Sequence, residues 1–212
     1  MDTSELKKGT TTLGMVCKDG VVLASETRAT MGNMIAHKYA DKIYKLDDNL
    51  GMTTAGLVGD DQAIARYVKA EVELHRMKTG SYMSVKSAAT LTSTILHSNR
   101  YYPFFVGLII GGVTGNIPSV YGLDAAGGMT EDKFVSIGSG SPFALGVLED
   151  YFEDGLSISE ANDIAIRAIR AAMERDSASG GKAVVVNITP KGYVKLEDKE
   201  IEKRWSKILK SV

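Results

Sequence analysis

The chain has 212 residues, of which 44% are hydrophobic and 24% are charged, and its formal net charge is −1. This composition is typical of a soluble globular protein with one large core or two small ones. No basic run stands out, which argues against nucleic acid or an anionic membrane as a partner. The longest apolar stretch, 104–113, is too short to span a bilayer.

Few residues are available for disulfide or metal chemistry. The single cysteine, Cys17, excludes an internal disulfide and is consistent with a reducing cytoplasm. It lies in phase with Leu13 and Met15, which predicts a small buried hydrophobe. The three histidines are too scattered for a helical zinc motif, so we expect surface positions, no metal and no cofactor for His37, His75 and His97. The first nine residues have no apolar segment, unlike a secretory signal, and we expect a cytoplasmic protein.

The chain opens with the pattern of two β-hairpins. Alternating apolar residues over 12–17 predict a half-buried strand, and Asp19-Gly20 predicts a tight turn into a second strand, Val21–Glu26. The second hairpin is predicted over 42–46 and 51–57.

The hydrophobic period then becomes helical. Residues 60–78 predict an amphipathic helix with Asp60 near its N-cap and Gly80 at its end. Its expected apolar face consists of Ala63, Tyr67, Ala70, Leu74 and Met77. Residues 83–99 predict a second helix.

The second half of the chain repeats this order. Strands are expected at 104–113, 119–123 and 134–137, followed by two helices. The clearer helix begins with a capping box formed by Ser157 and Glu160. The chain closes with a predicted hairpin and a short charged helix: 183–188, 193–196 and 198–210.

This order is not the strict alternation of a doubly wound parallel sheet. It favours an α+β fold, in which antiparallel sheets form a layered sandwich covered by helix pairs. No linker or repeat divides the chain, so we expect a single domain over 10–212.

A glycine-rich segment, Gly138-Ser139-Gly140-Ser141, has the composition of a phosphate-binding loop. It lacks the Gly-Lys-Ser/Thr ending of a P-loop, and Phe143 stands where a dinucleotide fingerprint needs glycine. We therefore expect no nucleotide site.

The junction between Gly9 and Thr10 has a distinct chemical meaning. A threonine hydroxyl is a poor nucleophile without a neighbouring base, and cleavage before the threonine frees an α-amine that can serve as that base. Residues 1–9 are accordingly interpreted as a propeptide, and Gly9 leaves the scissile carbonyl unhindered.

Several separated motifs, in order and with matching spacing, resemble the β subunits of the archaeal 20S proteasome. They lie at 9–12, 24–30, 41–46, 52–60, 138–141 and 175–181. The resemblance implies a four-layer αββα sandwich of the N-terminal-nucleophile hydrolase type. It also implies a threonine endopeptidase that degrades unfolded proteins inside a ring chamber and matures by cleaving its own chain between Gly9 and Thr10.

Carried over by position, the resemblance implies a catalytic set. Thr10 would be the nucleophile, Lys42 the active-site lysine and Glu26 its acidic partner, where many relatives have aspartate. Gly56 would supply an oxyanion-stabilising N–H. A polar network around the threonine amine would comprise Ser139, Asp176 and Ser179. Asp176 ends a predicted helix, an unfavourable place for an acid, which suggests a local partner.

The same carry-over implies a pocket for the side chain that precedes the cut. Its residues would be Ala29, Thr30, Ala40, Thr54 and Val58. Three of the pocket residues are small, which favours cleavage after bulky apolar residues.

Three other functions remain open from the sequence: a non-catalytic structural ring subunit, a bacterial heat-shock-type ring threonine protease, and a non-proteolytic amidase of the same nucleophile class. The Gly9-Thr10 junction and Lys42 argue against the first, and the segment 175–181 argues against the second. The implied partners are a homo-heptameric β ring stacked as two rings, α-subunit rings, an ATPase unfoldase and unfolded protein substrates.

Overall fold

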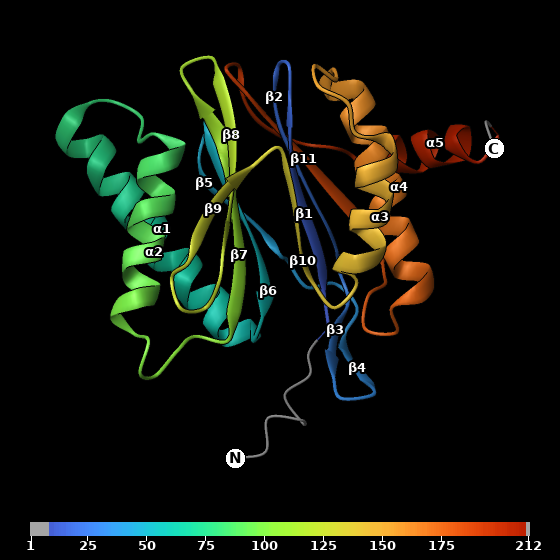
Figure 1. Ribbon diagram of the computed structural model, residues 1–212, viewed down its shortest axis with the longest axis horizontal. Helices are drawn as coiled ribbons and strands as arrows, with labels where there is room; N and C mark the ends of the chain where they lie inside the picture. Colours follow the sequence, from blue (N-terminus) through green and yellow to red (C-terminus); the bar gives the residue numbers. More distant parts are fainter. Residues whose placement is uncertain (1–8, 211–212) are drawn as a thin grey trace.

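The computed structural model describes residues 9–210. Two five-stranded antiparallel sheets lie face to face, and helices cover the outer face of each sheet (Figure 1). This is the four-layer αββα sandwich that the resemblance implied, and it agrees with the α+β layered sandwich expected from the order of elements.

The first sheet has the strand order β10-β1-β2-β11-β12. Its strands are β1 (Thr11–Cys17), β2 (Gly20–Glu26), β10 (Phe134–Gly138), β11 (Ala183–Thr189) and β12 (Gly192–Lys195). The second sheet has the order β5-β6-β7-β8-β9. Its strands are β5 (Ile43–Asp47), β6 (Leu50–Gly56), β7 (Val106–Thr114), β8 (Ile117–Leu123) and β9 (Met129–Asp132).

Helices pair on either side of the sandwich. The helices α1 (Val58–Thr79) and α2 (Val85–Ser98) cover the second sheet. The helices α3 (Ser141–Tyr151) and α4 (Ile158–Arg175) cover the first, and α5 (Asp198–Ile208) packs beside α4. Among residues 9–210, none of these helices combines the length and apolar character needed to cross a membrane.

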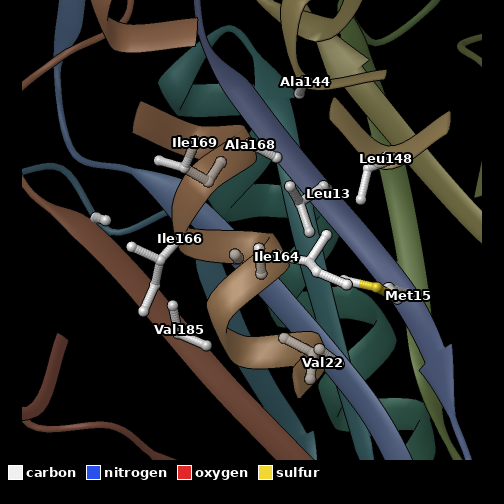
Figure 2. Packing of buried hydrophobic residues seen from close by; sticks show 14 of the residues in the cluster. Leu13, Met15, Val22, Ala144, Leu148, Ile164, Ile166, Ala168, Ile169 and Val185 are labelled. Carbon is white, nitrogen blue, oxygen red and sulfur yellow. The ribbon is translucent and has the colours of Figure 1, made fainter. Parts of the chain in front are cut away.

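The outer core of the first sheet shows how the layers are joined. Leu13 and Met15 of β1 point toward α4, where they meet Ile164, and Leu148 of α3 lies close by (Figure 2). All these side chains are largely or wholly buried, so each removes most of its apolar surface from water. The predicted capping box of α4, in which Ser157 and Glu160 each accept a hydrogen bond from the other's backbone N–H, is confirmed.

The prediction of a half-buried first strand was wrong, because β1 is buried on both faces. Leu13 faces the helices, while Gly14 faces the second sheet. A Cβ at Gly14 would lie 2.8 Å from Ile109 Cγ2, so glycine there lets the two sheets approach closely. Cys17 is buried as predicted, and desolvation by burial raises the pKa of its thiol to about 12.

The first helix differs from its prediction in two ways. It begins at Val58 with Leu57 as N-cap, and the Asp60 carboxylate instead accepts a hydrogen bond from Phe105 N at 2.9 Å. The predicted apolar face is also wrong: Tyr67 and Met77 are exposed. The buried apolar residues form a parallel stripe of small and branched side chains, which fit closely against the sheet: Ile64, Ala65, Val68 and Val72.

A short hairpin was not predicted at all. It consists of β3 (Ala29–Met31) and β4 (Met34–His37), joined by a turn in which Gly32 has φ 58°. The dipeptide Gly32-Asn33 is a turn signal that could have revealed it. The hairpin projects from one end of the sandwich, beside the start of the described chain (Figure 1).

Candidate active site

The predicted nucleophile and the predicted acid lie at the same end of the first sheet. Thr10 directly precedes β1, and Thr11 pairs with Gly138 at the end of β10. Glu26, the last residue of β2, pairs with Ala183 at the start of β11. Strand register thus brings the ends of four strands, β1, β2, β10 and β11, to one end of the sheet, where only 7% of Thr10 is exposed.

The Lys42 ammonium connects the nucleophile to the acid. Its Nζ donates hydrogen bonds to Thr10 Oγ1 and Glu26 Oε1, and a third to the Arg28 carbonyl at 2.6 Å. Desolvation by burial lowers the pKa of Lys42, and the negative charge of Glu26 opposes this shift. The lysine is therefore held against the hydroxyl and loses its proton more readily than a lysine in water.

The Glu26 carboxylate is completely buried, and each of its two oxygens accepts hydrogen bonds. Besides Lys42, its Oε1 accepts from Thr11 N at 3.2 Å. Its Oε2 accepts from Arg28 N at 2.6 Å and Gly180 N at 3.1 Å. A buried charge is tolerated when it is paired and fully hydrogen-bonded, and this carboxylate meets both conditions.

A second polar chain reaches the backbone nitrogen of the nucleophile. Thr10 N donates to Ser139 Oγ at 3.1 Å, and Ser139 Oγ donates to Asp176 Oδ2 at 2.5 Å. Ser179 Oγ donates to the same carboxylate oxygen at 2.6 Å and lies 2.7 Å from Thr11 Oγ1. Asp176 is the C-cap of α4, and these hydroxyls are the local partners that its position suggested.

Two glycines of the predicted site have no room for a side chain. A Cβ at Gly9 would lie 1.8 Å from Ala178 Cβ, and one at Gly56 would lie 1.9 Å from the Phe105 carbonyl oxygen. Gly9 N also donates to Thr30 Oγ1 at 3.3 Å. Close packing therefore accounts for both glycines, against side-chain atoms at Gly9 and against the Phe105 backbone at Gly56.

A pocket opens beside Thr10. It contains four of the five residues predicted for it: Ala29, Thr30, Ala40 and Val58. The fifth, Thr54, lies fully buried in β6 and does not line this pocket. Sequence reasoning missed three further lining residues with polar or charged side chains: Asp41, Tyr44 and Asp61.

A more spacious hollow lies at the opposite end of the sandwich, among the turns that join β5 to β6, β7 to β8 and β11 to β12. Its volume is about 570 Å³. None of the predicted site residues lines it, so the small pocket beside Thr10 is the one that belongs to the candidate site. Within residues 9–210, no group of three or more His, Cys, Asp or Glu side chains is placed to hold a metal ion.

The arrangement can perform nucleophilic acyl transfer. It holds a hydroxyl against a buried lysine, and the lysine against a buried carboxylate. A nucleophile within hydrogen-bond reach of a base, with the base oriented by a third group, is the general signature of covalent catalysis by a hydroxyl.

Comparison with known proteins identifies the family. A family model described as "Proteasome subunit" matches residues 6–188. The chain is 52% identical over 205 residues to a protein named proteasome subunit beta from Methanothermobacter thermautotrophicus, covering 96% of this chain and 98% of that protein. It is 52% identical over 203 residues to the protein of the same name from Methanosarcina barkeri, covering 95% of this chain and 96% of the relative. The chain therefore belongs to the proteasome subunit family, and within that family to the β subunits.

Proposed function

We propose that this chain is the catalytic β subunit of an archaeal 20S proteasome core and that Thr10 is its nucleophile. As a proteasome β subunit it is a threonine-type endopeptidase. The observation that carries the assignment of Thr10 is the contact between its Oγ1 and the buried Lys42 Nζ, which itself bonds to Glu26. A ring subunit that only built the chamber would have no need of this costly buried charge pair.

In the mature chain, the Thr10 α-amine takes the proton of the Thr10 hydroxyl as the oxygen attacks a peptide carbonyl. An α-amine has an unperturbed pKa of roughly 8, close enough to neutrality for this role. Lys42 keeps positive charge near the amine, which disfavours the protonated amine and leaves it free to act as base. The bond from Thr10 N to Ser139 Oγ supports a role for Ser139 and Asp176 in orienting that amine.

The negative charge that forms on the oxygen of the attacked carbonyl must be stabilised by a hydrogen-bond donor. Gly56 lines the same pocket as Thr10, which supports a role for its backbone N–H in stabilising this charge. A donor of this kind is typically worth about 3–4 kcal/mol in the transition state.

Maturation uses the same nucleophile before a free amine exists. Thr10 Oγ1 attacks the Gly9 carbonyl, the Gly9–Thr10 C–N bond breaks, and the acyl group passes to oxygen as an ester. Water then hydrolyses the ester, which releases residues 1–9 and leaves residues 10–212 with a free threonine amine. Lys42 Nζ is in contact with the hydroxyl in this leader-bearing chain, so it can take the proton when neutral.

Membership of the family implies assembly with proteasome α subunits. We propose the finer organisation that the resemblance suggests: a homo-heptameric β ring, two such rings stacked between α rings, and an ATPase that unfolds protein substrates. A cytoplasmic location is part of the same proposal. The predicted leader comprises residues 1–9, and residues 1–8 of it lie outside the described residues.

Intact mass and N-terminal sequencing, before and after assembly with the α partner, test the proposal. We expect residues 1–9 to be lost and a free Thr10 amine to react with a mechanism-based threonine probe. A Thr10→Ala chain should assemble but keep its leader. A leader that persists in the assembled wild-type particle, with no labelling of Thr10, would contradict catalysis and favour a structural subunit.

A further inference from the structure

Arg28 contacts both members of the buried charge pair beside Thr10, although it was not predicted as a site residue. It follows the last residue of β2 by two positions, and its backbone N–H donates to Glu26 Oε2 at 2.6 Å. Its carbonyl oxygen accepts a hydrogen bond from Lys42 Nζ at 2.6 Å. The backbone at position 28 therefore helps to set where the lysine ammonium lies.

The half-buried side chain of Arg28 leads to a different part of the site. Its Nη1 donates to the Ser177 carbonyl at 3.0 Å, and Ser177 directly follows Asp176, the C-cap of α4. Carbonyl groups at a helix C-terminus lack partners within the helix, and the helix dipole favours a cation there. The guanidinium therefore brings a positive charge to the end of α4 at which the Asp176 carboxylate lies.

The guanidinium also packs closely over Gly180. The three atoms nearest to a Cβ at Gly180 would all belong to the Arg28 guanidinium, with Cζ at 2.3 Å and Nε at 2.6 Å. Gly180 does not have a positive φ, so its backbone conformation does not itself require glycine. The Arg28 side chain thus contacts the segment 177–180 at both of its ends.

This segment carries and adjoins the groups that reach the nitrogen of the nucleophile. Ser179 Oγ donates to Asp176 Oδ2 at 2.6 Å, and Ser139 Oγ donates to the same oxygen at 2.5 Å. Thr10 N in turn donates to Ser139 Oγ at 3.1 Å. A shift of the segment would therefore move the carboxylate that orients Ser139 and, through it, the Thr10 nitrogen.

Backbone hydrogen bonds already fix Gly180 beside the end of β2. Its carbonyl accepts from Thr27 N at 3.2 Å and Arg28 N at 3.0 Å, and its N–H donates to Glu26 Oε2 at 3.1 Å. These bonds do not depend on the side chain at position 28. The guanidinium should therefore matter most at the start of the segment, next to Asp176, where it binds the Ser177 carbonyl.

We propose that Arg28 is a positioning residue for peptide cleavage. Its guanidinium holds the segment 177–180 in place, and this segment keeps Asp176 aligned with the Thr10 amine. Arg28 is not among the described residues that line the pocket beside Thr10, so it acts on the reaction through Asp176. The inference rests on the proposed function, because it requires Thr10 to cleave peptides.

Arg28→Ala tests the side chain while leaving the backbone N–H and carbonyl of residue 28 in place. Wild-type and variant chains are assembled with the α partner, and a mechanism-based threonine probe counts the active sites. We expect kcat per labelled site to fall about tenfold or more while KM stays within about threefold, because misalignment slows the chemical step. A general loss of structure would instead lower the number of labelled sites. An unchanged kcat per labelled site would overturn the inference.

The matched control is Arg175→Ala, which removes an exposed arginine from the last turn of the same helix. It should leave kcat within about twofold, as expected for a surface substitution. A loss equal to that of Arg28→Ala would show that any positive charge at this helix end suffices, and would contradict a specific role for Arg28.

Gly180→Ala tests the same contact from the other side and does not require Arg28→Ala to assemble. Its methyl group should displace the guanidinium, so kcat should fall as in Arg28→Ala. In the double variant Arg28→Ala/Gly180→Ala the methyl group no longer meets the guanidinium, so kcat should lie within about twofold of that of Arg28→Ala alone. Losses that multiply in the double variant would show that the two residues act independently, which would overturn the inference.

Failure of the proposed function gives a different result. If wild-type particles cleave no peptide and the probe does not label Thr10, the proposed function is wrong and the inference falls with it. Labelling and cleavage by wild-type particles, together with full kcat in Arg28→Ala particles, contradict the inference alone.

Discussion

The Glu26 carboxylate accepts a hydrogen bond from the backbone N–H of Gly180 at 3.1 Å, across 154 residues of sequence. The same carboxylate holds Lys42 against Thr10. One buried acid thus joins β2, the segment after α4 and the segment before β5. Its loss should affect both the stability of this end of the sandwich and the position of the lysine.

We therefore expect Glu26→Gln to reduce both stability and activity. The amide cannot offer acceptors to every donor around the carboxylate, and it leaves the Lys42 ammonium buried without a counter-charge. Breaking a buried pair in this way costs about 3–5 kcal/mol. Urea unfolding of the unprocessed chain measures the stability, and kcat/KM of assembled particles measures the activity. Glu26→Asp is the control, since it keeps the charge and should lose less stability and less activity than Glu26→Gln. A fully active and stable Glu26→Gln chain would refute the role of the Glu26 charge in holding Lys42.

The second prediction concerns the leader junction. A Cβ at Gly9 would lie 1.8 Å from Ala178 Cβ and 2.6 Å from Ser139 Oγ. Gly9→Ala should displace the scissile carbonyl and slow leader release by about tenfold or more, since overpacking costs about 1–3 kcal/mol. A time course of intact mass after mixing with the α partner measures the rate.

The matched control for Gly9→Ala is the double variant Gly9→Ala/Ala178→Gly, which removes the clashing methyl group. Leader release should recover in the double variant if the contact with Ala178 is responsible. Equal slowing in the single and double variants would show that the clash with Ala178 is not the cause.

The residues of the candidate site were predicted from the sequence through motifs that resemble those of a known family, and the structure places several of these motifs at the ends of strands and helices. Glu26 ends β2, and the antiparallel register of the sheet places it at the end where β1 begins. Asp176 caps α4, and its hydrogen bonds to Ser139 and Ser179 bring it to the same place. Their contacts could not be derived from the sequence. Hydrogen bonds such as that between Glu26 and Gly180 depend on the path of the segment that joins α4 to β11, which passes beside the end of β2.

The first helix shows where sequence reasoning was insufficient. Its two apolar stripes have the same period, and periodicity alone cannot decide which stripe faces a sheet. Close packing against the second sheet selects the stripe that contains Ile64 and Val68 and leaves Tyr67 exposed. The same rotation of the helix turns Asp61 toward the pocket, which is why this residue was missed.

A third prediction concerns stability away from the site. Ser157 and Glu160 form a capping box at the start of α4, with Ser157 Oγ accepting from Glu160 N at 3.3 Å and Glu160 Oε2 accepting from Ser157 N at 2.9 Å. Ser157→Ala should lower the free energy of unfolding by about 1 kcal/mol, the usual cost of losing an N-cap. Urea unfolding of the wild-type and variant chains measures this difference in the free energy of unfolding. The control is Ser206→Ala in α5, whose hydroxyl donates to the Glu202 carbonyl within its own helix. An equal loss in the control would argue against a capping effect.

The last prediction concerns the pH dependence of peptide cleavage. Asp176 lies one hydroxyl away from Thr10 N through Ser139, and its charge also raises the pKa of Lys42, although burial lowers that pKa by more. A nearby carboxylate favours the protonated form of an amine and so raises the amine's pKa. Asp176→Asn should therefore lower the pKa of the mature Thr10 amine and of Lys42. Since the free amine must be unprotonated to act as base, the acid limb of the kcat/KM profile should move to lower pH.

The same substitution should reduce the maximal rate. It replaces a charge-assisted hydrogen bond to Ser139 with a neutral one, and hydrogen bonds to charged groups contribute about 1.5–3 kcal/mol, equivalent to roughly 10–100-fold in rate if fully lost. Kinetics from about pH 5 to pH 10 separate the two effects. Ser179→Ala is the matched comparison, because it removes a donor to Asp176 and leaves the carboxylate charge in place. An acid limb that stays in place in Asp176→Asn, or that shifts equally in both variants, would show that the Asp176 charge does not control the pKa of the catalytic amine.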